Sequence, residues 1–152
     1  MARAELSEQD WGIRLAVYRG FVDGAGPPTY AQVARQLDIP AEEAGRAYHR
    51  LHRQHALFLE PGTDAVRMAN PLSAVPTAYR VHAGGRWLWA NCAWDSLGIP
   101  AMLHADARIE ATFAHSGEAA TYAVAAGRLA AGDWLVHFPL PFRHWYDDLI
   151  HT

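Results

Sequence analysis

Two short helical patterns, separated by a tight turn and followed by a pair of apolar runs, constrain the fold of the first half of this chain more than any other feature. The first pattern covers residues 30–37, the turn lies at 38–40, and the second pattern covers about 41–55. The runs LFLE and AVRMA flank a Pro-Gly pair at 61–62 and predict a β-hairpin. This order of elements predicts a winged helix-turn-helix-like lobe.

A further amphipathic helix is expected ahead of this unit. Ser7 followed by Asp10 fits an N-cap, and the glycines and prolines of residues 24–28 end the pattern. Apolar residues recur between them at intervals of three and four, which is the period of a helix with one apolar face. That face is formed by Trp11, Leu15, Tyr18 and Val22.

The second half of the chain predicts short strands around one helix. RWLWAN is a strand pattern that passes into a helix through CAWDSLGIPAML, and residues 107–126 form a hairpin pattern that turns at Ser116-Gly117. DWLVHFPL predicts another strand, and FRHWYDDLIHT an amphipathic helix. The expected fold class is α+β with a mainly antiparallel sheet, divided into a winged-helix-like lobe at 1–72 and a small mixed domain at 73–152.

The amino-acid composition limits the kinds of molecule that the protein is expected to bind. A formal net charge of -3 over 152 residues gives no overall positive field for nucleic acid or an anionic membrane. A single cysteine excludes an intramolecular disulfide framework and favours a reducing compartment. No apolar run has the length of a transmembrane helix. We therefore expect a cytoplasmic protein without a membrane partner. The sequence does not predict its oligomeric state.

The second helix of the winged unit carries basic side chains that could face DNA. Its outer face is expected to hold Arg46, His49, Arg50, His52 and Arg53, with Ala44, Tyr48, Leu51 and His55 facing inward. Base contacts are usually made from the N-terminal end of such a helix, where this chain places Glu42 and Glu43. Residues 1–70 carry about as many acids as bases, although phosphate binding needs a positive excess. An accessory helical lobe is therefore favoured over DNA binding, which stays open as an alternative.

The lone Cys92 lies where a predicted strand passes into a predicted helix. Free backbone N–H groups and the positive end of a helix dipole would lower the pKa of its thiol and favour the thiolate. Asp95 follows one turn later on the same side of the helix, where a carboxyl group can hold or deliver a proton. The plainer interpretation is a buried apolar thiol with an aspartate that stabilises the first helical turn. Both interpretations remain open from the residues alone.

The segments NPLSAVPTAYRV and WANCAWDSLGIPAML resemble the organomercurial (alkylmercury) lyases, with a likeness that covers most of the chain and is strongest at 70–103. The resemblance implies that Cys92 binds the mercury of R–Hg⁺ as thiolate and that Asp95 passes a proton to the leaving carbon, so that both residues meet mercury as substrate or product. It also implies a detoxifying lyase that releases a hydrocarbon and Hg(II), needs no cofactor and gives Hg(II) to external thiols. Trp89 and Trp94, packed in the core around the site with Trp87, are candidates for the apolar wall of a substrate pocket.

One departure from the family pattern bears on activity. The lyases use a second cysteine, which the resemblance places at or just beyond Thr152, whereas this sequence contains only Cys92. Either the sequence stops short of a longer parent, or the protein is a one-cysteine relative. The alternative function is a non-catalytic winged-helix regulator, or a sensor that uses Cys92 to bind a soft metal or another thiol-reactive ligand.

Overall fold

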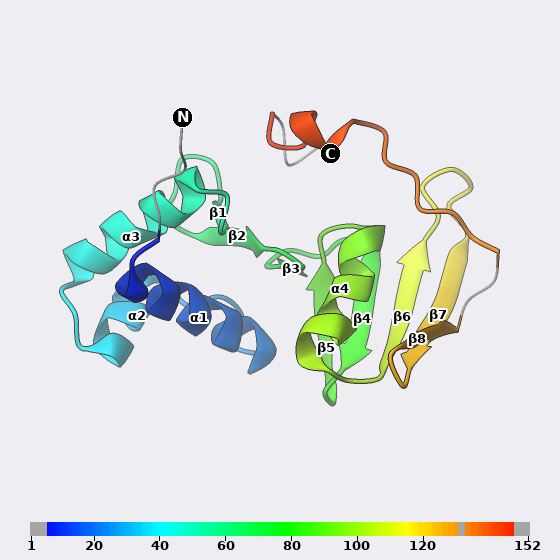
Figure 1. Cartoon of the computed structure of the whole chain (residues 1–152), viewed down its shortest axis with the longest axis horizontal. Coiled ribbons are helices and arrows are strands. Elements are labelled where there is room, and N and C mark those ends of the chain that lie inside the picture. The colour runs from blue at the N-terminus through cyan, green and yellow to red at the C-terminus, as the bar shows by residue number, and fades with distance from the viewer. Residues whose placement is uncertain (1–5, 131–132, 148–152) are drawn as a thin grey trace.

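A computed structural model describes residues 6–130 and 133–147, and in this part of the chain four α-helices accompany one antiparallel sheet (Figure 1). The helices are α1 (Glu8–Val22), α2 (Tyr30–Leu37), α3 (Ala41–Arg53) and α4 (Ala93–Leu103). The first three gather at one end of the molecule, and α4 lies over the sheet at the other end. The expected α+β class with an antiparallel sheet is confirmed.

The described strands form one sheet in the order β1-β2-β3-β5-β4-β6-β7-β8, in which every neighbouring pair is antiparallel. The bounds are β1 (Phe58–Leu59), β2 (Val66–Ala69), β3 (Leu72–Ser73), β4 (Tyr79–Ala83), β5 (Arg86–Ala90), β6 (Ala107–Thr112), β7 (Ala119–Ala125) and β8 (Arg128–Ala130). The short strand β3 pairs with β2 on one side and with β5 on the other, and so joins the hairpin β1-β2 to the longer strands β4–β7. The sheet therefore runs through the expected boundary between residues 72 and 73, and a division into two domains stays a prediction.

Helix α1 begins as predicted, but only part of the expected face packs: Tyr18 and Val22 lie against the core and are partly buried. Ser7 and Asp10 form a capping box at its start. Trp11 and Leu15, expected on the packing face, are 52% and 49% exposed. The buried side chains are instead Asp10, Ile13, Ala16, Val17 and Phe21. Apolar residues occur around most of this helix, so their spacing alone did not show which stripe would meet the other elements.

Helices α2 and α3 and the hairpin β1-β2 follow in the predicted order. Thr29 caps α2 with a second capping box, and Asp38 ends it in the left-handed conformation. Ala44, Tyr48 and Leu51 of α3 are buried as expected. His55 was expected to face inward on the same helix, but α3 ends at Arg53 and the His55 side chain is exposed. Its backbone has a φ of 58°, which an α-helix cannot continue.

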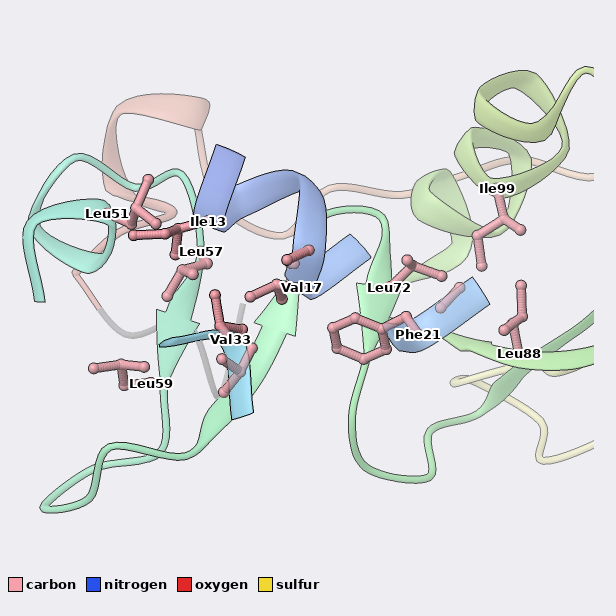
Figure 2. Packing of buried hydrophobic residues seen from close by; sticks show 14 of the residues in the cluster. Ile13, Val17, Phe21, Val33, Leu51, Leu57, Leu59, Leu72, Leu88 and Ile99 are labelled. Atoms are coloured by element: carbon pink, nitrogen blue, oxygen red, sulfur yellow. The ribbon is translucent and has the colours of Figure 1, made fainter. Parts of the chain in front are cut away.

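The hydrophobic core is continuous between the helices and the sheet. Figure 2 shows Phe21 of α1 beside Leu72 of β3, with Leu88 of β5 and Ile99 of α4 beyond it. Leu72 and Ile99 are fully buried, and all of these side chains belong to one cluster of buried residues. The helix end of the molecule and the sheet end thus share apolar contacts, which fix α1 relative to β3 and α4.

The segment after β8 differs from its prediction. The hairpin β6-β7 turns at Ser116-Gly117 as expected, but residues 133–140 form no strand. Aromatic contacts hold this segment instead of ladder hydrogen bonds: the Trp134 ring lies 5.6 Å from those of Phe113 and Tyr122, between centroids. The amphipathic helix predicted for 142–152 is described only to residue 147, as a 3₁₀ turn at Phe142–His144; its remainder lies outside the described residues. The segment returns across one end of the sheet (Figure 1).

Candidate functional site

Cys92 is the N-cap residue of α4, two positions after the end of β5. Its Sγ accepts a hydrogen bond from the backbone N–H of Asp95 at 3.5 Å. The predicted passage from strand to helix at this cysteine is therefore confirmed. Serine, threonine, asparagine and aspartate are the preferred N-caps because oxygen is the better acceptor. Capping alone does not account for a sulfur atom at this position.

The Cys92 thiol has a raised pKa, which contradicts the expected depression. Burial is the largest cause, and the negative charge of Asp95 together with a hydrogen bond to that carboxylate adds to it. Hydrogen bonds from the backbone N–H groups of Trp94 and Asp95 favour the thiolate but are outweighed. The sequence-based expectation rested on the helix start alone. It did not include the two effects that raise the pKa of the thiol, which are burial and the neighbouring carboxylate. In the free protein, the thiol therefore holds its proton at neutral pH.

Asp95 also has a raised pKa, again because of burial. Hydrogen bonds from the Asn91 side chain and from the Cys92 thiol favour its carboxylate form and partly offset that rise. The thiol and the carboxyl group thus lie within the same turn of α4, and each affects the pKa of the other. A thiol proton and a carboxyl group with a raised pKa are what a proton relay to a bound substrate needs.

A cavity of about 310 Å³ lies at the start of α4 and brings the two predicted site residues together. It is lined by Arg67, Met68, Asn70, Ser73, Val75, Pro76, Thr77, Asn91, Cys92, Trp94, Asp95 and Trp145. The predicted candidate Trp94 is therefore part of its wall. Trp145 of the segment after β8 also lines the cavity, and the Phe138 ring links it to Trp94 with centroid distances of 5.2 and 6.3 Å.

The other tryptophans of the predicted pocket lie elsewhere. Trp89 is not among the residues that line the cavity, and its side chain leaves β5 opposite to the buried Leu88 and Ala90. The Arg80 guanidinium lies 4.3 Å from the Trp87 ring centroid and 5.6 Å from that of Trp89. Trp87 is 40% exposed and Trp94 58% exposed, so the expectation that they pack in the core is wrong.

Two asparagines next to the cysteine were missed by the sequence interpretation. Asn91 Nδ2 donates to Asn70 Oδ1 at 3.1 Å, and both residues line the cavity. The Asn91 Oδ1 atom is buried without a hydrogen-bond partner among the described residues. A buried acceptor beside a cavity is ordinarily satisfied by water or by a ligand. The available signal was the asparagine that directly precedes the cysteine in sequence.

A larger groove of about 680 Å³ lies between α1 and the end of α4. Its walls include the exposed Trp11 and Leu15 of α1, together with Met102 and Leu103 at the end of α4. It shares Asn70 with the cavity at Cys92. Neither Cys92 nor Asp95 reaches it. The smaller cavity is therefore the candidate site, since it contains the groups that can do chemistry.

The fold and the site define a class of small α+β proteins in which a thiol and a carboxyl group share the first turn of a helix. The alkylmercury lyase family model matches residues 72–149, and the chain belongs to this family. The structure titled "Crystal structure of the mercury-bound form of MerB2" is similar with a TM-score of 0.70 and 27% sequence identity. The match covers 84% of this chain and 61% of that one. No curated protein matches the chain.

Two further observations concern metals and membranes. Among residues 6–130 and 133–147, no group of three or more histidine, cysteine, aspartate or glutamate side chains could hold a metal ion. None of the described helices is both long and apolar enough to cross a membrane.

Proposed function

We propose that this protein cleaves carbon–mercury bonds by protonolysis, with Cys92 as the sulfur ligand of mercury and Asp95 as the proton carrier. The observation that carries the proposal is that Cys92 and Asp95, linked by the hydrogen bond from the Asp95 backbone N–H to the Cys92 sulfur, line one small cavity. A soft sulfur ligand suits mercury, and membership of the alkylmercury lyase family supports the same chemistry.

The proposed reaction has two steps. In the first, sulfur bonds to the mercury of R–Hg–X, the thiol proton passes to the Asp95 carboxylate, and X⁻ leaves. In the second, Asp95 gives this proton to the carbon as the C–Hg bond breaks, so R–H departs and Hg(II) stays on the Cys92 thiolate. The raised pKa of Asp95 keeps the proton available between the steps.

External thiols complete the cycle in this proposal. With Cys92 as the one cysteine of the sequence, a small thiol supplies the second sulfur for Hg(II) and removes it from the site. The cavity of about 310 Å³ has room for a small organic group beside the sulfur. Trp94 and Trp145 give one side of it an apolar wall. We propose that the protein acts in this way in the cytoplasm, as part of mercury detoxification.

Separate measurements of binding and turnover test the assignment of roles. Asp95→Ala is expected to bind phenylmercury one-to-one like the parent but to release no benzene, because the thiol ligand is intact and the proton carrier is gone. Cys92→Ser is expected to lose the tight binding itself. Asp64→Ala is the matched control, because it removes an exposed carboxylate in the loop between β1 and β2, where it pairs with His49. This variant should bind and turn over phenylmercury like the parent. Loss of binding in Asp95→Ala would show that the aspartate is structural.

The second candidate is a winged-helix regulator that binds DNA through α3. The order α2, α3, β1, β2 supports it, but two arginines of the basic face of α3 are already paired. Arg46 bonds to Glu42 and Glu43, and Arg50 bonds to the buried Asp10. These ion pairs reduce the positive charge available to phosphates. Fluorescence anisotropy with labelled duplex DNA is expected to show no salt-dependent binding, and a clear salt-dependent signal would favour the regulator.

A further inference from the structure

A chain of hydrogen bonds leads from α1 to the residue before Cys92. The Arg14 guanidinium donates to Tyr18 Oη at 2.7 Å, and Tyr18 Oη donates to the backbone carbonyl of Asn70 at 2.7 Å. The Asn70 side-chain carbonyl in turn accepts from Asn91 Nδ2 at 3.1 Å. Residues far apart in the sequence are thus joined by three bonds of ordinary length.

Asn91 is held by its backbone as well as by its side chain. Its N–H donates to the carbonyl of Pro71 at 3.3 Å, so the segment 70–71 fixes it at two points. A side-chain amide carries two N–H hydrogens. One is used by Asn70, and a hydrogen bond from the Asn91 side chain also reaches the Asp95 carboxylate, whose pKa it lowers. Asn70, Asn91 and Asp95 all line the cavity that contains Cys92.

We propose that Tyr18, Asn70 and Asn91 are positioning residues that orient the Asp95 carboxyl group toward the sulfur of Cys92. This inference rests on the proposed lyase function, which it extends to residues of the helical end of the molecule. Asn91 acts on Asp95 directly, whereas Tyr18 acts through Asn70. The helical end therefore takes part in the chemistry without contributing a reacting group.

Electrostatic contacts agree with this arrangement. A hydrogen bond from the Asn91 side chain lowers the pKa of Asp95, although burial raises it overall. Burial also raises the pKa of Tyr18, and the charge of Asp95 adds to that effect. A carboxyl group turned away from the sulfur would lose its short path to the thiol proton.

Matched tyrosine variants test the proposal. Tyr18→Phe removes the hydroxyl that holds Asn70, and we expect kcat for benzene release to fall about five- to tenfold with KM unchanged, as for one lost hydrogen bond. Tyr48→Phe is the control, since it loses a similar bond at 2.8 Å to the carbonyl of Pro28, away from the cavity. Its kcat is expected to stay at the parent value. Asn91→Ala is expected to lose at least about tenfold in kcat.

A readout that needs no turnover separates this inference from the proposed function. The side-chain NH₂ signals of Asn91 in NMR spectra are expected to shift and exchange faster in Tyr18→Phe, but not in Tyr48→Phe. Unchanged Asn91 signals, or an unchanged kcat in Tyr18→Phe, would overturn the positioning role. If the parent releases no benzene, the proposed function fails, and the Asn91 signals alone decide whether the network exists.

Discussion

The Cys92 sulfur accepts a hydrogen bond from the backbone N–H of Asp95 at 3.5 Å, which holds the thiol beside the Asp95 carboxyl group at the start of α4. Burial is the main reason why a helix start that should favour thiolate instead raises the pKa of this thiol, and the charge and hydrogen bond of the Asp95 carboxylate add to the rise.

Removal of the carboxylate is expected to make Cys92 more reactive toward alkylating reagents. Burial is the largest cause of the raised thiol pKa, and the charge and hydrogen bond of Asp95 add to it. In Asp95→Asn the pKa of Cys92 should therefore fall while remaining above the ordinary value. Iodoacetamide at pH 8 should react about two- to fivefold faster with this variant than with the parent. An equal or slower reaction would contradict the account of the thiol.

The same substitution is expected to stabilise the protein at neutral pH. A carboxyl group whose pKa is raised on folding weakens the folded state as the pH rises through that pKa. Asp95→Asn removes the buried charge, so we expect its Tm at pH 7 to exceed that of the parent by about 2 °C. Near pH 3, where Asp95 is protonated in both states, the difference should vanish. A lower Tm at pH 7 would indicate that the carboxylate is structurally favourable.

The ion pair between Arg50 and Asp10 is expected to be the main charged contribution to the helical end. Burial raises the pKa of Asp10, but hydrogen bonds from Arg50 and Ser7 outweigh it and lower the pKa overall. Asp10 is 5% exposed at the side chain, so Arg50→Gln should reduce the free energy of unfolding by about 1–3 kcal/mol at pH 7. Urea titration measures this value.

A control on the same helix separates this pair from a surface pair. Arg46→Gln removes pairs with the exposed Glu42 and the partly exposed Glu43, and should cost at most about 0.5 kcal/mol. A carboxyl group whose pKa is lower in the folded than in the unfolded protein stabilises the fold when the pH is above its unfolded-state pKa. This stabilisation is lost as the pH falls through the folded-state pKa. The deficit of Arg50→Gln should therefore shrink below about pH 4. Equal deficits in both variants, or a deficit independent of pH, would contradict the assignment.

Trp94 is expected to contribute to binding of the organic group and little to folding. It lines the cavity at Cys92 but is 58% exposed. Trp94→Ala should raise KM for phenylmercury about three- to tenfold with kcat and Tm nearly unchanged, because apolar contact to the substrate is lost. Trp87→Ala, which alters an exposed tryptophan that packs with Arg80, serves as the control. Equal KM values in the two variants would exclude a role for Trp94 in binding.

Local signals in the sequence predicted the elements that depend on a few neighbouring residues. The Ser7 cap, the turn at Ser116-Gly117 and the passage from strand to helix at Cys92 each follow from short-range chemistry, and each is found in the structure. The resemblance then brought Cys92 and Asp95 forward as a pair, and the family membership is confirmed. Their catalytic roles remain predictions.

Features that depend on packing between distant segments were not accessible in this way. The face of α1 that is buried follows from where α3 and the sheet lie, and periodicity favoured the stripe of Trp11 and Leu15 instead. The thiol pKa depends on burial and on the carboxylate, which a helix-start argument omits. The segment 133–140 has a strand-like composition but is held by aromatic side chains. Such effects arise only once the chain is folded.

Benzene release from phenylmercury in excess small thiol, compared between the parent and Cys92→Ser, tests the central claim most directly. We expect the parent to release benzene repeatedly and the variant to release none above the uncatalysed rate, since the variant lacks the sulfur ligand of mercury. Tight one-to-one binding of the mercurial without benzene release from the parent would contradict the lyase and favour a sensor that uses the same thiol.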